Sequence, residues 1–134
     1  MRSEELRSEL CETLRRMAAG GLVLDGAVVE GPRPSVHTHS PYATAVSCVL
    51  DEIPTVEPEQ EEVVGGALPV ASPAPSGGAA LGEAVLAAAR ERWAAVVRNH
   101  GPVCFGRDLA GALACAFAVE ENARIYALAR LLKS

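Results

Sequence analysis

Two short stretches, VHTHSPYATAVS at residues 36–47 and AVVRNHGPVCFG at residues 95–106, contain every histidine of this chain. His37 and His39 stand two residues apart, and on an extended strand that spacing points both imidazoles to the same face of a sheet. His100 lies between two apolar runs, at the tip of a predicted turn. We therefore predict that the two stretches meet in the fold and bring three ring nitrogens together.

Such a set of nitrogens is suited to a metal ion. Three histidine ligands with one open coordination position are typical of a catalytic zinc rather than of a closed structural one. An ion of that kind, zinc or another divalent metal, polarises a carbonyl or an enediolate of a bound substrate. The alternative is that His37 and His39 decorate a surface and that His100 is an ordinary turn residue. Spacing alone favours neither interpretation.

Composition indicates a small folded domain. A chain of 134 residues suits a single core, and 49% hydrophobic against 22% charged residues excludes disorder. The net charge of −5, without a stripe of Lys and Arg, argues against a nucleic-acid partner. Residues 1–14 lack the apolar core of a signal peptide, and no stretch is long enough to span a membrane, so we expect a cytoplasmic protein. The four widely spaced cysteines are predicted to be buried free thiols: Cys11, Cys48, Cys104 and Cys115.

Local patterning predicts an α/β fold, with helices lying on a layered sheet. We expect helices over residues 4–19, 41–50, 79–92 and from Asp108, its N-cap, towards Leu132, and a solvated helical turn over 57–62. Strands are expected over 22–24 and 27–29, joined by an Asp25-Gly26 hairpin turn, and over 53–56, 68–71, 93–98 and 103–105.

The stretches around the histidines resemble the class II aldolase and adducin family, which includes L-fuculose-phosphate aldolase. The similarity extends over IPTVEPEQEEVVGG at 53–66, LPVASPAP at 68–75 and residues 108–130, so it covers about the C-terminal two-thirds of the chain. The joint occurrence of HTHSPYAT and RNHG is the specific part of this signal.

The resemblance implies a three-layer α/β/α sandwich around a mostly antiparallel central sheet, as one class II aldolase-like domain over residues 1–134. It implies a homo-oligomer, a ring-like tetramer with active sites between subunits. It also implies a divalent metal, zinc above all, on His37, His39 and His100. The expected reaction is reversible aldol cleavage of a small hydroxy-ketone or sugar phosphate through a metal-stabilised enediolate.

The chain departs from the family pattern at two places, so we interpret it as a shortened member. After residues 18–23 there is no equivalent of the Gly-Asn-containing stretch that helps to bind the substrate phosphate. The Ser-Ser-Glu segment, whose Glu serves as catalytic acid or base, is also missing, because Gly31-Pro32-Arg33-Pro34-Ser35 runs directly into Val36. Metal binding needs only the imidazoles, whereas carbon–carbon cleavage also needs a base and donors for the phosphate.

Several nearby residues are candidates to replace the missing groups. Glu57 is the first candidate base, with Glu30 and Glu59 behind it, although an exposed solubilising carboxylate is the simpler interpretation of each. Tyr42 is a candidate to hydrogen-bond an intermediate from across a subunit boundary, or a packing residue. Ser35 is a candidate fragment of the phosphate site, or a turn cap. Two residues beside His100 are predicted either to orient it or to face water: Arg98 and Asn99.

These observations leave two classes of function open. The first is a metal-dependent lyase of the class II aldolase type, acting on a small-molecule carbonyl compound. Decarboxylation, dehydration or epimerisation on the same metal site is not separated from aldol cleavage by these residues. The second is a non-catalytic metal-binding or assembly protein, which the loss of the Glu and of the phosphate segment favours.

Overall fold

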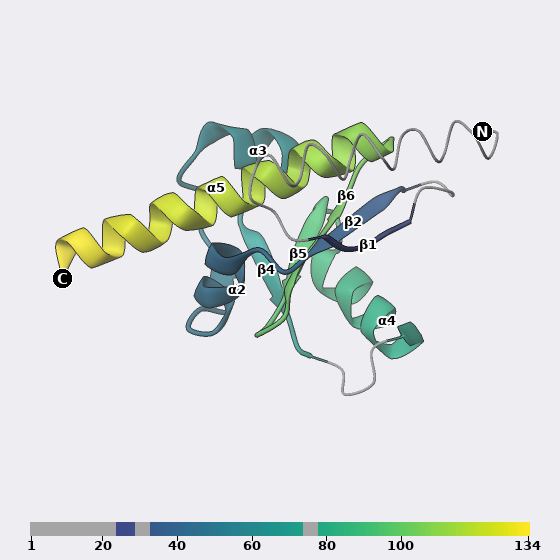
Figure 1. The fold of residues 1–134 in the computed structure, drawn as a ribbon, viewed down its shortest axis with the longest axis horizontal. Coiled ribbons are helices and arrows are strands. Elements are labelled where there is room, and N and C mark those ends of the chain that lie inside the picture. The colour runs from purple at the N-terminus through teal and green to yellow at the C-terminus, as the bar shows by residue number, and fades with distance from the viewer. Residues whose placement is uncertain (1–23, 29–32, 74–77) are drawn as a thin grey trace.

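A computed structural model describes residues 24–28, 33–73 and 78–134 of the chain, with side chains placed for 33–73 and 84–134. The predicted helix over residues 4–19, Glu30 and Cys11 lie outside these ranges. Helices and strands alternate along most of the described chain (Figure 1). In order they are β1 (Leu24–Val28), β2 (Ser35–Thr38), α2 (Pro41–Ser47), β3 (Glu52–Ile53), α3 (Pro58–Val64), β4 (Leu68–Ala71), α4 (Gly78–Ala89), β5 (Ala94–Val97), β6 (Gly101–Phe105) and α5 (Leu109–Lys133).

The strands form one sheet in the order β1-β2-β6-β5-β4-β3. Its neighbouring strands are antiparallel except for β4 and β5, which are parallel. That parallel pair is joined by α4, because parallel neighbours need a crossover connection that a tight turn cannot supply. The mostly antiparallel sheet implied by the family resemblance is therefore confirmed, and the sheet is a mixed one.

Helices cover both faces of the sheet, which confirms the three-layer arrangement. Successive residues of β5 point to opposite faces: Ala94 and Val96 pack into the cluster that contains α2, α3 and α5, while Ala95 and Val97 pack against α4. Figure 1 shows α4 on the other side of the sheet from α5. Burial on both faces explains why this strand is four apolar residues in a row, without the polar alternation of a half-exposed strand.

The long helix α5 begins as predicted. Its N-cap is Asp108, whose carboxylate accepts a hydrogen bond of 2.7 Å from the backbone N–H of Gly111. Its buried residues recur every three or four positions, which is the period of a helix face packed on a sheet. From Arg124 onward its residues are half-buried or exposed, and Figure 1 shows this end projecting beyond the sheet.

Other local predictions had mixed outcomes. The strand at residues 68–71, the start of a helix at Pro41 and the antiparallel strands before and after His100 are confirmed. The Asp25-Gly26 hairpin is wrong, because β1 runs through both residues and pairs with β2, with a shift of register between Leu24 and Gly26 that accommodates one extra residue. The strand predicted over 53–56 is shorter and begins one residue earlier, since β3 is Glu52–Ile53. It ends there because Pro54 has no N–H with which to extend the ladder.

The cysteine prediction is partly wrong. Cys104 and Cys115 are buried free thiols, as expected, whereas Cys48 is exposed because it follows the last turn of α2 and faces away from the core. A hydrogen bond with Cys115, together with burial, raises the pKa of the Cys104 thiol well above its usual value. The Cys104 thiol is therefore protonated, and both side chains pack as part of the apolar core. Within the described ranges, no helix is both long enough and apolar enough to cross a bilayer.

Candidate metal centre

The structure brings the three histidines together at one end of the sheet. The Nε2 atom of His100 lies 3.2 Å from Nε2 of His37 and 3.0 Å from Nε2 of His39. One ring nitrogen from each residue lies within 4.8 Å of the other two. His37 belongs to β2, His39 follows its last residue, and His100 lies in the turn between β5 and β6.

Backbone geometry explains this convergence. His37 pairs with Val103 of β6, so the turn that precedes β6 folds back against the end of β2. In that turn Asn99 adopts a φ of 64° and Gly101 a φ of 150°, both in the region that favours residues with little steric demand. A Cβ atom on Gly101 would lie 2.0 Å from the carbonyl oxygen of Thr38. Only glycine lets the turn approach the strand this closely.

A hydrogen bond orients the ring of His37. Its Nδ1 atom lies 2.9 Å from the carbonyl oxygen of Pro102. Because a carbonyl oxygen only accepts, Nδ1 must carry the hydrogen and donate it. In the neutral imidazole this leaves the lone pair on Nε2, which faces His100 and His39. Histidines that bind metal ions are held in the same manner, by a hydrogen bond from the ring nitrogen that does not bind the ion.

The donor set fits a divalent ion. Zinc–nitrogen bonds of 2.0–2.1 Å in a tetrahedral site separate neighbouring nitrogens by about 3.4 Å, which is close to the distances observed here between the Nε2 atoms. His37 and His100 are half-buried and His39 is exposed, so one side of the cluster is open to solvent. Within the described ranges, no carboxylate or thiolate belongs to this group. The cluster could therefore hold a metal ion through three nitrogens and leave a position for another ligand.

The predicted catalytic and substrate-binding residues lie on three different elements: the N-terminus of α3, the first turn of α2 and the start of β2. Glu57 is the half-buried N-cap of α3, where its backbone N–H donates to Asn122 Oδ1 at 2.9 Å. Its carboxylate is not part of the histidine group. Tyr42 lies in the first turn of α2 and packs against the main core cluster. Ser35 begins β2, two residues before His37, and alternation along the strand places both on the same face.

Of the two residues that precede His100, Arg98 does not simply face water, whereas the side chain of Asn99 is exposed. Arg98 donates to the carbonyl oxygen of Ser47 at 2.8 Å and forms an ion pair of 2.6 Å with Asp51. The backbone N–H of Asn99 donates to Ser47 Oγ at 3.2 Å. Both residues therefore attach the His100 turn to the C-terminal end of α2.

One residue near the site was not found by sequence reasoning. The i,i+4 spacing of Glu120 and Arg124 on a helix favours a surface ion pair, but Arg124 pairs with Glu121 instead. The Glu120 carboxylate accepts hydrogen bonds from the backbone N–H groups of Ala43 at 2.8 Å and Tyr42 at 3.1 Å. Burial raises its pKa, and the hydrogen bonds oppose that shift. The only sequence signal was indirect: the first turn of α2 contains no acidic residue of its own.

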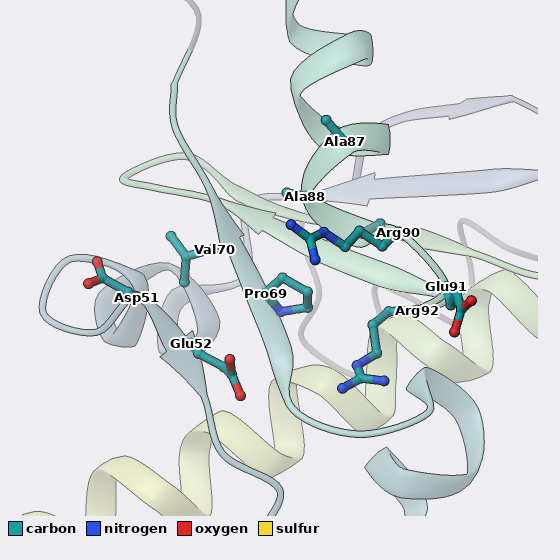
Figure 2. A pocket seen from close by; sticks show the side chains of 10 residues that line it. Asp51, Glu52, Pro69, Val70, Ala87, Ala88, Arg90, Glu91 and Arg92 are labelled. Carbon is teal, nitrogen blue, oxygen red and sulfur yellow. The ribbon is translucent and has the colours of Figure 1, made fainter.

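A separate pocket of about 660 Å³ lies between the β3–β4 edge and the C-terminal end of α4, and it shares no residue with the histidine cluster. Figure 2 shows Arg90 and Arg92 on the α4 side of β4, and Asp51 and Glu52 on the other side. The Arg92 guanidinium already donates to the carbonyl oxygens of Gly65 at 3.0 Å and Ala67 at 3.2 Å. With mixed charges and no convergent set of donors, this pocket is a weaker candidate for chemistry than the histidines.

Comparison with known proteins identifies the family. The sequence pattern of the class II aldolase and adducin N-terminal domain matches residues 33–127, so the chain belongs to this family. It is 34% identical over 91 residues to a 5-methylthioribulose-1-phosphate/5-deoxyribulose-1-phosphate aldolase from Rhodospirillum rubrum, covering 68% of this chain and 41% of that protein. It is 37% identical over 94 residues to a 3-oxo-tetronate 4-phosphate decarboxylase from Pectobacterium atrosepticum, covering 67% of this chain and 43% of that protein.

Solved structures agree with this assignment. The crystal structure of L-fuculose-1-phosphate aldolase from Thermus thermophilus superposes with a TM-score of 0.68 at 27% identity, over 75% of this chain and 54% of that one. Another L-fuculose 1-phosphate aldolase gives a TM-score of 0.69 at 29% identity, over 75% of this chain and 47% of that one. The chain spans less than half the length of the two curated relatives that it matches.

Proposed function

We propose that this chain is a divalent-metal-dependent lyase of the class II aldolase type, which cleaves or forms a carbon–carbon bond in a small hydroxy-ketone or sugar phosphate. The observation that carries the proposal is the convergence of three Nε2 atoms, with those of His37 and His39 at 3.2 and 3.0 Å from that of His100. Family membership supports the same reaction class.

His37, His39 and His100 would hold the ion, for which we propose zinc. When bound, such an ion supplies Lewis-acid stabilisation of negative charge that develops on a carbonyl oxygen of the substrate. The Pro102 carbonyl keeps the His37 ring in the tautomer that this binding requires. The exposed side of the cluster, next to His39, is where a small substrate would enter.

Proton transfer is the less complete part of the site. We keep Glu57 as the proposed base, Tyr42 as a proposed hydrogen-bond donor to the reacting substrate and Ser35 as a proposed contact to the phosphate. The half-buried position of Glu57 in the loop that leads into α3 is compatible with that role. A single domain over residues 1–134, a homo-oligomer such as a tetramer and a cytoplasmic location complete the proposal.

A specific observation favours a second candidate function. Among the described residues no carboxylate lies in the histidine group, and the Ser-Ser-Glu segment of the family is missing between Gly31 and His37. A site with three imidazoles and no base binds metal without cleaving a substrate. The chain would then be a metal-binding or assembly protein. The relative that is a decarboxylase also supports carbon dioxide release on the same metal site as a variant of the first function.

The first experiment is metal analysis of the full chain and of the variants His37→Ala, His39→Ala and His100→Ala. We expect about one zinc ion per chain in the wild type and none in the variants, each with an unchanged circular dichroism spectrum. An exposed-site control, Glu59→Gln, should retain the ion. Unchanged metal content in His37→Ala would refute the site.

The second experiment separates the candidate functions. Metal-loaded protein is incubated with 5-methylthioribulose 1-phosphate, L-fuculose 1-phosphate and 3-oxo-tetronate 4-phosphate, and aldehyde and carbon dioxide are measured. Aldehyde release that disappears in Glu57→Gln but not in Glu59→Gln supports aldol cleavage with Glu57 as base. Full activity in Glu57→Gln removes that residue from the mechanism. Bound metal without turnover of any compound favours the non-catalytic function.

A further inference from the structure

We propose that Glu120 is a positioning residue of the metal centre: acting through Ser40 and the start of α2, it sets the place of His39 against His100. This inference rests on the proposed metal site. It assigns a role to a carboxylate that lies on α5, at a sequence separation of about 80 residues from the ligand that it would position.

The first step is the contact between α5 and the segment that follows His39. The Glu120 carboxylate accepts from the backbone N–H groups of both Tyr42 and Ala43, one with each oxygen. Ser40 occupies the N-cap position of α2, yet its side chain makes no capping hydrogen bond. The start of α2 is therefore held by α5 where most helices use a local cap.

The second step is a buried polar network behind the histidines. Thr38 and Ser40, the two neighbours of His39 in the chain, are both fully buried. The Thr38 hydroxyl donates to Ser40 Oγ at 3.2 Å, and the Ser40 hydroxyl is a hydrogen-bond partner of Glu120. The Thr44 hydroxyl donates to the Ser40 carbonyl oxygen at 2.7 Å. Buried polar groups that lose their partners destabilise the fold, so the network specifies one arrangement.

The third step connects this network to the ligand. His39 is itself exposed, but the residues on both sides of it are fixed by the network. Its Nε2 atom must stay near 3.0 Å from that of His100 for both to reach one ion. Loss of groups that orient metal ligands typically weakens metal affinity about 10- to 100-fold. Glu120 therefore acts on metal affinity without touching the ion.

The test is zinc affinity, measured by competition with a chromophoric chelator, for wild type, Glu120→Ala, Glu120→Gln and the neighbouring control Glu121→Gln. We expect at least a tenfold weaker Kd in Glu120→Ala and a smaller loss in Glu120→Gln, whose amide retains one acceptor. Glu121→Gln should match the wild type, because that carboxylate pairs with Arg124 on the surface. The absorption spectrum of the cobalt-substituted protein reports ligand geometry independently of stability.

Zinc affinity and the cobalt spectrum of these variants separate a positioning role of Glu120 from a purely structural one. A folded Glu120→Ala protein with wild-type zinc affinity and cobalt spectrum overturns the inference. If Glu120→Ala does not fold, the same two measurements are made on Glu120→Gln and Ser40→Ala, which keep most of the packing. Wild-type zinc affinity and cobalt spectrum in both variants would then overturn the inference. His39→Ala separates this inference from the proposed function. If His39→Ala binds zinc as tightly as the wild type, the metal site itself is wrong; if it loses zinc while the Glu120 variants do not, only the positioning role is wrong.

Discussion

Gly101 shows how one residue sets the geometry of the histidine cluster. Its φ is 150°, and a Cβ atom added to it would lie only 2.0 Å from the Thr38 carbonyl oxygen, so there is no room for a side chain. We expect Gly101→Ala to reduce the free energy of unfolding by about 2–4 kcal/mol and to lower metal content, because His100 is the residue before it. Urea unfolding and metal analysis measure the two effects.

A second glycine provides the matched control. At Gly111 the nearest atom to a Cβ is Asp108 Oδ1 at 3.1 Å, a side-chain atom that can move. Gly111→Ala also gains helix propensity, so its stability should stay within about 1 kcal/mol of the wild type. If Gly101→Ala unfolds at the same urea concentration as Gly111→Ala, the close approach of the turn to β2 is not as tight as described.

The buried carboxylate of Glu120 predicts a pH effect with a definite sign. Burial raises its pKa above the ordinary 4.5 in the folded protein, with a smaller contribution from the charge of Glu121. The folded state therefore binds this proton more tightly than the unfolded chain does. The contribution of this proton to the free energy of unfolding is fully present below pH 4.5 and is lost as pH rises through the raised pKa of Glu120. The stability of wild type relative to Glu120→Gln should decrease from acidic towards neutral pH.

Glu121 should show the opposite trend and serves as the control. Its hydrogen bond with Arg124 lowers its pKa, so its contribution is present above pH 4.5 and is lost as pH falls through the lowered value. Chemical unfolding of wild type, Glu120→Gln and Glu121→Gln across acidic pH measures both trends. If the free energies of unfolding of the two variants, each relative to the wild type, changed with pH in the same direction, the opposite pKa shifts of Glu120 and Glu121 would be contradicted.

At the scale of elements, Asn122 joins α5 to the loop between β3 and α3. Its Oδ1 accepts from the backbone N–H groups of Val56 at 2.8 Å and Glu57 at 2.9 Å, and its Nδ2 donates to the Pro54 carbonyl oxygen at 3.0 Å. The side chain is fully buried. We expect Asn122→Ala to lower the free energy of unfolding by about 2–3 kcal/mol, since three hydrogen bonds are lost and a cavity is left.

The comparison variant for this joint is Glu121→Ala, one residue earlier on the exposed side of the same helix. Loss of its surface ion pair with Arg124 should change stability by less than about 1 kcal/mol. Guanidinium unfolding of both variants at one pH gives the two values. Equal losses would mean that the loop is held by contacts other than Asn122.

Element boundaries with a local chemical cause were predictable from the sequence. Pro41 starts α2 and Asp108 caps α5 because proline fits the first turn of a helix and a carboxylate can accept its free N–H groups. The prediction of an Asp25-Gly26 turn was wrong because a dipeptide that suits a hairpin also fits a β-bulge within a strand. Pairing of β1 with β2 selected the strand conformation.

At the scale of the whole molecule, metal binding should be linked to folding. The proposed ligands come from β2, from the segment after it and from the β5–β6 turn, so an unfolded chain cannot hold them together. A ligand at a concentration of about 100 times its Kd stabilises the folded state by about 2.7 kcal/mol. Zinc should therefore raise the melting temperature of the wild type, and a chelator should reverse the change.

His37→Ala is the variant that checks this linkage, because it removes one ligand and leaves the turn of His100 in place. Differential scanning calorimetry with and without zinc should show no metal-dependent shift for it. An equal shift in wild type and in His37→Ala would place the stabilising ion somewhere other than the histidine cluster.

The sequence by itself determined the family, the spacing that puts His37 and His39 on one face of a strand, and the helices and strands whose limits have local causes. The tertiary structure alone decided which elements adjoin: that α4 covers the opposite face of the sheet, that Gly101 brings His100 to the end of β2, and that Glu120 and Asn122 of α5 bind distant backbone N–H groups. The physical reason is range. Strand periodicity and capping act between near neighbours in the chain, whereas these contacts join segments separated by about 60 to 80 residues and form only when the sheet has brought them together.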